Sequence, residues 1–199
     1  MRIGNLSYAD TVSPDASSEL TSDHDALGLT HIDGGGTARM VDVSGKPWTR
    51  RRALAGCRVV IGPPIVRDPD GDAGDDGDAV RDPRAASALL REVFAVARIA
   101  GVQAAKDTAS LVPLCHLLPG LVVDVRITLG SNGIAVEGEA VTTGPTGVEM
   151  EALTACAFAA LNVVSGLRRT HPETSIEDLA LWEKSGGRSG SWERVVGSR

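Results

Sequence analysis

Apolar residues recur at intervals of three and four from Arg84 onward, which is the pattern of a helix with one buried face. The members of this stripe are Leu89, Val93, Val96, Ala97, Ala100 and Ala104. We expect the helix to end near Lys106 or Ala109. Gly101 lies in its interior, where a glycine costs about 1 kcal/mol relative to alanine. That cost indicates a close packing contact at Gly101.

A second apolar stripe predicts another helix after Thr146. Its members are Met150, Leu153, Ala157, Leu161 and Val164. Thr146 followed three residues later by Glu149 has the spacing of a capping box, in which the two side chains bond the free backbone groups of the first turn. We expect the helix to end near Gly166 or Arg169, before Pro172.

Alternation of apolar and polar residues predicts strands around these helices. Residues 121–130 and 133–143 alternate, and Ser131-Asn132 between them has the composition of a tight hairpin turn. Shorter strands are expected around residues 38–43, 57–62 and 179–183. The resulting order of strand, helix, two strands, helix and strand predicts an α+β sandwich of the ferredoxin-like type. Such a fold has an antiparallel sheet with both helices packed on one face.

Three segments lack the periodicity of a folded core. Residues 1–28 are rich in Ser, Asp, Thr and Ala, which predicts a flexible N-terminal extension. Residues 67–83 hold seven aspartates and three glycines, which predicts a loop or disordered insertion. Residues 191–199 form a C-terminal tail in this interpretation, and residues 29–190 form a single domain that carries the insertion.

Composition narrows the function further. The net charge of −6 argues against a protein held to nucleic acid by bulk charge, and only 3% of residues are aromatic. Three cysteines without CxxC spacing indicate neither a disulfide framework nor a zinc site. No run approaches the roughly 18 apolar residues of a membrane span. We therefore expect a cytoplasmic protein that binds no membrane, metal or cofactor.

Two stretches carry most of the candidate chemistry. The first holds Lys106, Cys115 and His116, and a histidine at such a boundary between helix and strand can act as an acid or base near neutral pH. The alternatives are a structural histidine, a buried inert thiol, and a lysine that interacts with the helix dipole. The second stretch holds Glu149 and Glu151, which lie two residues apart and so face opposite sides of a helix. One carboxylate can cap the helix while the other reaches a ligand.

Basic residues gather in two further places. Arg50, Arg51 and Arg52, with Lys46, form the densest positive charge in the chain. They fit either a phosphate clamp or the solvated face of a short helix. The segment KSGGRSG (184–190) sets two cations in flexible glycine backbone, which suits a phosphate or an exposed tail. It lacks the spacing of a Walker loop.

Several blocks of the chain resemble the cyclic pyranopterin monophosphate synthase family of molybdenum cofactor biosynthesis. The blocks are LTHID and MVDVSGK (29–46), ARIAGVQAAKDT (97–108), LVPLCHLLP (111–119), TGPTGVEMEALTACAFAALNVV (143–164) and KSGGRSG (184–190). The resemblance implies a ferredoxin-like subunit, dimers that assemble into a hexamer, and active sites at the dimer interface. The activity that it implies is that of a lyase that converts 3′,8-cyclo-7,8-dihydro-GTP into cyclic pyranopterin monophosphate and releases pyrophosphate.

The resemblance also assigns roles to individual residues. The catalytic positions are His116, Glu149, Glu151 and Arg168, the last in place of a family lysine. The substrate-binding positions are Arg51, Lys106, Cys115, Met150 and Lys184.

The chain departs from the family pattern at four positions. Leu90 and Arg168 stand where the family has catalytic lysines, Ser165 stands for an aspartate, and Leu117 stands for a proline. An arginine keeps the positive charge but does not readily exchange a proton, and a leucine can do neither. The alternatives are therefore a divergent synthase, an impaired paralogue with a binding or regulatory role, or an enzyme redirected to another modified nucleotide.

Overall fold

The computed structural model describes residues 36–63 and 83–195, and side chains in the second range from residue 87. The chain divides into two units, Met1–Asp42 and Val43–Arg199. In the described part of the first unit, Ala38 forms an isolated bridge, so the strand predicted at residues 38–43 is wrong. The predicted extension 1–28 and all of the predicted insertion except Pro83 lie outside the described residues.

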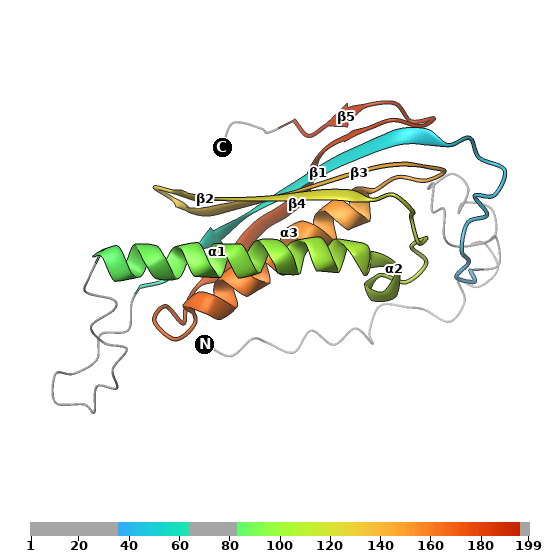
Figure 1. Ribbon diagram of the computed structural model, residues 1–199. Coiled ribbons are helices and arrows are strands. Elements are labelled where there is room, and N and C mark those ends of the chain that lie inside the picture. Colours follow the sequence, from blue (N-terminus) through green and yellow to red (C-terminus); the bar gives the residue numbers. More distant parts are fainter. Residues whose placement is uncertain (1–35, 64–82, 196–199) are drawn as a thin grey trace, which may run out of the picture. The chain divides into compact units, whose positions relative to one another are not determined.

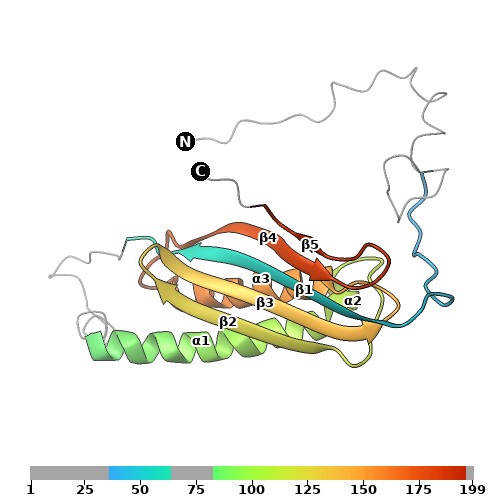
Figure 2. The same ribbon diagram turned by 90° about the horizontal axis from the view of Figure 1, so that it is seen from above.

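The described part of the second unit is a sheet covered by helices on one face (Figure 1). In chain order its elements are β1 (Thr49–Val60), α1 (Pro83–Lys106), α2 (Thr108–Leu111), β2 (Val122–Gly130), β3 (Gly133–Gly144), α3 (Glu149–Leu167), β4 (Ser175–Ser185) and β5 (Trp192–Glu193). The strands are antiparallel and lie in the order β2-β3-β1-β4-β5. Figure 2 shows the helices beneath this sheet. This is the ferredoxin-like α+β sandwich that the sequence predicts.

β1 is longer than predicted and includes the basic segment. It pairs with β3 from Thr49, opposite Gly144, to Val59, opposite Ile134. The three arginines 50–52 therefore lie on a strand, and their interpretation as a helix face is wrong. Three consecutive charged residues hide the alternation by which a half-buried strand is recognised.

The remaining strands follow the predictions with changes at their ends. The hairpin of β2 and β3 is confirmed, and Gly133 completes its turn with a φ of 120°, which favours glycine. β4 begins four residues earlier than predicted, at Ser175, and Asp178 adopts a φ of 57° where the pairing with β1 shifts register. The short strand β5 lies within the segment expected to be a tail.

α3 starts without the predicted capping box. Its first residue is Glu149, its N-cap is Val148, and the N-cap makes no side-chain capping bond. The carboxylate of Glu149 instead accepts a hydrogen bond from Lys184 Nζ at 3.2 Å. The predicted end near Gly166 is confirmed, because the helix ends at Leu167.

α3 also has the length and composition of a membrane-spanning helix, so the expectation that no segment approaches that size is wrong. Half of this apolar stretch is buried inside the structure. Its buried residues include Ala152, Ala155 and Ala159, each with 0% exposure. α3 is therefore the core helix of the sandwich.

Small residues allow α1, α3 and the sheet to approach closely. A Cβ atom at Gly101 of α1 would lie 2.6 Å from the carbonyl oxygen of Ala155 and 3.0 Å from Val125 Cγ2. A Cβ atom at Gly138 of β3 would lie 2.6 Å from the carbonyl oxygen of Ala152. The close contact predicted at Gly101 is confirmed, and Gly138 makes a second one from the sheet side.

We predict that Gly101→Ala lowers the free energy of unfolding by about 1–3 kcal/mol, the usual cost of overpacking. The added methyl overlaps backbone oxygen, which cannot rotate away, and this outweighs the gain of about 1 kcal/mol in helix propensity. Urea unfolding measures the change. Gly45→Ala is the control, because a Cβ atom there meets nothing within 4 Å. Equal stability of the two variants would contradict the prediction.

Candidate functional site

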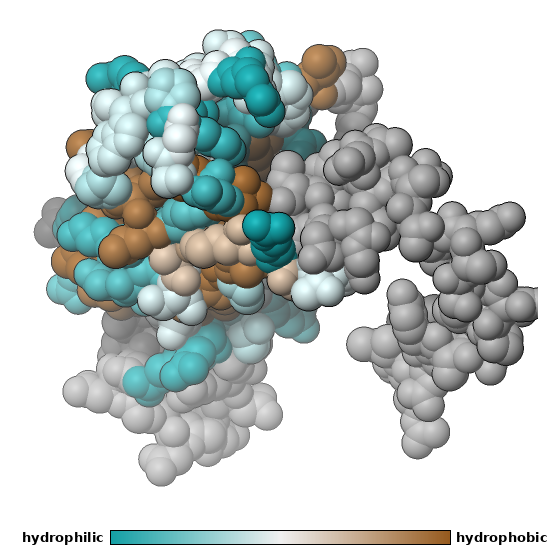
Figure 3. All heavy atoms as spheres, turned by 90° about the vertical axis from the view of Figure 1, so that its right-hand side faces the viewer, coloured by the Kyte–Doolittle hydropathy of each residue, from teal (hydrophilic) through white to brown (hydrophobic). Residues whose placement is uncertain are grey.

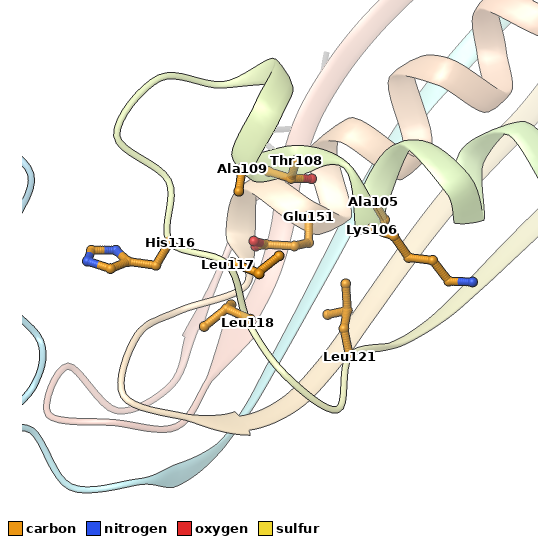
Figure 4. Close-up of a pocket in the computed structure, with 9 residues that line it drawn as sticks. All are labelled: Ala105, Lys106, Thr108, Ala109, His116, Leu117, Leu118, Leu121 and Glu151. Atoms are coloured by element: carbon orange, nitrogen blue, oxygen red, sulfur yellow. The ribbon is translucent and has the colours of Figure 1, made fainter.

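A cavity of about 250 Å³ opens where α1 ends and α3 begins. Figure 4 shows the side chains that line it, which are Ala105, Lys106, Thr108, Ala109, His116, Leu117, Leu118, Leu121 and Glu151. They come from α1, α2, the loop 112–121 and the first turn of α3. We call this the first cavity. The structure therefore brings together Lys106, His116 and Glu151, which the sequence offers in separate motifs.

The charged side chains of the first cavity point in different directions. The carboxylate of Glu151 points toward Leu117, whereas the His116 ring and the Lys106 amine extend away from each other at opposite ends (Figure 4). Lys106 is also the last residue of α1, so the helix-dipole interpretation holds beside the substrate one. Glu151 is thus the polar group directed into the cavity, with His116 at its rim.

Glu151 is buried, with 5% exposure. Burial raises the pKa of its carboxyl to about 7, and the negative charge of nearby Glu149 adds to this, while a bond to its own backbone opposes it. A carboxyl that titrates near neutral pH can both take and give a proton. Glu151 therefore has the properties of a general acid or base.

Cys115 is half-buried in the loop that carries His116. Burial, and then the charge of Glu151, raise the pKa of its thiol, so it stays protonated near neutral pH. A thiolate nucleophile at Cys115 is therefore disfavoured. Within the described residues, no cluster of three or more His, Cys, Asp or Glu side chains could hold a metal ion.

A second pocket, of about 130 Å³, lies on the other side of the α3 N-terminus. Its lining is polar and comprises Arg51, Arg52, Gly147, Val148, Glu149, Lys184, Ser185, Gly186 and Ser189. We call it the anion pocket. It brings together the two basic segments that the sequence places more than a hundred residues apart.

The cations of the anion pocket are not equivalent. Arg52 bonds Glu139 at 2.5 Å and Glu183 at 2.6 Å, so two carboxylates compensate its charge.

Lys184 is paired with Glu149 at 3.2 Å. Arg51 donates only to the carbonyl oxygen of Pro145 at 3.3 Å, and its buried Nε atom has no partner among the described residues. Arg51 is therefore the cation best placed to bind an incoming anion.

The glycines after Lys184 let the chain turn against β1. Gly186 and Gly187 have φ values of 97° and 74°, which favour glycine. A Cβ atom on Gly187 would overlap the Arg51 guanidinium, and one on Gly186 would overlap the carbonyl oxygen of Arg50. The turn therefore encloses Arg51 only because both residues lack a side chain.

The remaining predicted residues lie elsewhere. Met150 is 37% exposed in the first turn of α3. Arg168 is the exposed C-cap of α3, which places it about 25 Å from Glu151 at a helical rise of 1.5 Å per residue.

α1 runs antiparallel to α3, because Gly101 approaches Ala155 whereas Val93 approaches Gly166. Leu90, one turn before Val93, therefore lies near Arg168. Within one chain, the predicted site residues therefore form two groups. Leu90 and Arg168 lie at one end of the helical layer, and Glu151 lies at the other.

Sequence reasoning missed two features of the site. Leu114 adopts a φ of 68° directly before Cys115 and His116, a conformation that is strained for a leucine. Thr142 donates a hydrogen bond to the Pro119 carbonyl oxygen at 2.8 Å and so contacts the same loop. The sequence gives no signal for the strained leucine, and a threonine on a strand looks like an ordinary strand residue.

The MoaC family model matches residues 40–187, which include both the first cavity and most of the anion pocket. A Thermomicrobium roseum protein named cyclic pyranopterin monophosphate synthase is 46% identical over 168 residues, covering 83% of this chain and 93% of the relative. A Streptomyces avermitilis protein of the same name is 42% identical over 166 residues, covering 83% and 89%. A mitochondrial Arabidopsis thaliana protein of that name is 41% identical over 170 residues, covering 84% and 57%.

We predict that Glu151→Gln increases stability at alkaline pH. The pKa of Glu151 is raised from 4.5 to about 7 on folding, so the native state loses stability as pH rises from about 4.5 through about 7. Glutamine cannot ionise, so the variant should exceed the wild type by about 3 kcal/mol above pH 7 and match it more closely below pH 4.5. Urea unfolding at several pH values measures the difference.

Glu177→Gln is the control for this comparison, because Glu177 is half-exposed, pairs with Arg58 at 2.7 Å, and is not among the charges that act on Glu151. Its removal should not stabilise the protein at alkaline pH. A Glu151→Gln variant whose stability follows the same pH curve as the wild type would contradict the assignment of the titrating group.

Proposed function

We propose that this chain, which belongs to the MoaC family, is a lyase of molybdenum cofactor biosynthesis. Its substrate in this proposal is 3′,8-cyclo-7,8-dihydro-GTP or a close analogue, its product is cyclic pyranopterin monophosphate, and pyrophosphate is released. The observation that carries the proposal is the position of Glu151, in a cavity beside an anion pocket that contains Arg51. The proposed location is the cytoplasm.

In this proposal the anion pocket binds the substrate, and the first cavity holds the groups that transfer protons. A guanidinium presents paired N–H donors that match phosphate oxygens, so Arg51 binds the phosphate chain. Lys184 contributes a second positive charge when the anion competes with Glu149 for it. The part of the substrate derived from the purine then reaches the first cavity, where Glu151 and His116 lie.

Release of pyrophosphate requires proton transfer and charge stabilisation together. As the cyclic phosphate closes, a substrate hydroxyl forms a new oxygen–phosphorus bond, the bond from phosphorus to pyrophosphate breaks, and the hydroxyl proton leaves. Glu151, whose pKa is about 7, can accept that proton. Arg51 and Lys184 stabilise the negative charge that develops on the leaving pyrophosphate.

A second copy of the chain completes the site in this proposal. The helical layer exposes apolar side chains on α1 and α3, namely Leu89 (39%), Val96 (58%), Ile99 (72%), Phe158 (36%) and Leu161 (50%). A two-fold contact through this layer buries them and sets the C-terminus of one α3 opposite the N-terminus of the other. Arg168 of one copy then lies near Glu151 of the next, which joins the two separated groups. Three such dimers would form the hexamer that the family resemblance implies.

Figure 3 views the end of the molecule near α2. Hydrophobic side chains gather in the middle of this face, with hydrophilic ones around them. Two apolar residues near α2, Leu111 and Leu117, are 46% and 80% exposed. An apolar surface beside the first cavity, which Leu117 also lines, suits either the face of a heterocyclic ring or a neighbouring subunit.

The presence of Leu90 and Arg168, where the family has lysines, favours a second candidate function. Leu90 packs against the core, and Arg168 keeps a charge that can hold phosphate without exchanging its proton readily. Proton transfer then falls on Glu151 and His116 alone. If these two do not suffice, the chain is a binding or regulatory paralogue that keeps the ligand pocket.

We predict that the purified protein releases pyrophosphate and forms a fluorescent pterin product from 3′,8-cyclo-7,8-dihydro-GTP. Glu151→Gln should lower kcat about 10²- to 10⁴-fold, the usual loss on removal of a general acid or base. Arg51→Ala should chiefly raise KM. Arg58→Ala is the matched control, because Arg58 is a half-exposed arginine of the same strand that pairs with Glu177.

Two outcomes would contradict the synthase proposal. Binding without product would support the paralogue function, and a variant with lysine at positions 90 and 168 would then show whether the two replacements are the cause. Absence of both binding and turnover would overturn the proposal altogether.

A further inference from the structure

Thr142 is a buried polar residue on the inner face of β3. It is 3% exposed, and its neighbour on the same face, Ala140, is 0% exposed. A hydroxyl in such surroundings is costly unless it is hydrogen-bonded. Oγ1 of Thr142 donates to the carbonyl oxygen of Pro119 at 2.8 Å, which satisfies it.

Pro119 belongs to the loop 112–121, which forms one wall of the first cavity. His116, Leu117, Leu118 and Leu121 all line that cavity. Pro119 is followed by Gly120, whose φ of 64° turns the chain into β2. The hydrogen bond from Thr142 therefore holds the loop at its last turn, three residues after His116.

The methyl group of Thr142 and the side chain of Leu118 approach the same glycine, Gly144. A Cβ atom at Gly144 would lie 3.6 Å from Leu118 Cδ2 and 3.6 Å from Thr142 Cγ2, so both side chains adjoin this glycine. Leu118 lines the first cavity directly. The threonine hydroxyl thus contacts the wall that carries His116, and the methyl group lies near a glycine that Leu118 of the same wall also approaches.

Thr142 also stands beside the anion pocket. In the pairing of β3 with β1, its Cα partner is Arg51. The main chain of Thr142 is thereby tied to the arginine that binds the anion, and its side chain is tied to the loop of the first cavity. Thr142 therefore connects the first cavity with the anion pocket, both of which the proposed reaction uses.

We propose that Thr142 is a positioning residue, which sets His116 and the cavity wall at a fixed distance from the phosphate contacts of Arg51. The catalytic consequence rests on the proposed function, whereas the effect on the loop does not. A valine at position 142 keeps the shape, removes the hydroxyl, and leaves the Pro119 carbonyl oxygen without its partner.

Cys115 reports the position of the loop without any substrate. It is half-buried, whereas Cys57 and Cys156 are 4% and 0% exposed, so a disulfide reagent such as DTNB reacts first with Cys115. Thr142→Val should make this reaction several-fold faster, because the loop is no longer held. Thr142→Ser keeps the hydroxyl and should react at the wild-type rate. Cys115→Ser should abolish the fast phase and so identify the signal.

Thr143→Val is the matched control. Thr143 is the next residue of β3, is exposed, and pairs with Arg50. The same substitution there removes a hydroxyl from the other face of the strand and should leave both the thiol reaction and turnover at wild-type values. Thr142→Ala supplies a second variant without the hydroxyl if Thr142→Val does not fold.

Turnover tests the catalytic half of the proposal. Thr142→Val should lower kcat about 10- to 100-fold, the loss expected when a reacting group is misplaced by about 1 Å. KM should change much less, because Arg51 stays on its strand, and Thr142→Ser should restore kcat. A folded Thr142→Val protein with wild-type thiol reactivity and wild-type kcat would overturn the proposal. A wild-type protein without turnover would contradict the proposed function alone, since the thiol measurement still tests the loop.

Discussion

The close approach of α3 to the sheet and to α1 is the constraint on which the rest of the structure depends. Backbone oxygens of α3 lie 2.6 Å from where Cβ atoms of Gly101 and Gly138 would stand, so the helix is held from two sides at once. Such a contact leaves little freedom to rotate or slide, because the opposing atoms are backbone rather than movable side chains. The orientation of the first turn of α3, and with it the direction of Glu149 and Glu151, follows from this packing.

The fixed first turn gives two neighbouring glutamates opposite environments. Glu151 faces inward, loses its water and titrates near neutral pH. Glu149 faces the anion pocket and pairs with Lys184 from β4. A difference of two positions on a helix thus separates a buried carboxyl with a raised pKa from a carboxylate that pairs with a cation. Arg51, which the glycine turn after Lys184 encloses, lines the same pocket.

Much of the fold could be predicted from the sequence, because α1, α3 and the hairpin of β2 and β3 have strong periodicity. The strand at Arg50 to Arg52 could not, since its charges obscure the alternation and are compensated by Glu139 and Glu183 from distant strands. The capping box failed for a similar reason: Glu149 bonds Lys184, 35 residues away, instead of its own helix. Family resemblance gave the candidate residues, but the structure shows that the length of α3 separates Arg168 from Glu151 within one chain. The antiparallel packing of α1 on α3 separates Leu90 from Glu151 in the same way.

The central claim is that two copies of the chain share each site, and the activity of mixed oligomers tests it most directly. Copies with Glu151→Gln and copies with Arg168→Glu, each impaired alone, would be co-expressed in equal amounts and purified together. Random pairing leaves about one quarter of the sites with both native residues, so about one quarter of wild-type turnover should return. Turnover no greater than the average of the two separate variants would contradict a site shared between copies.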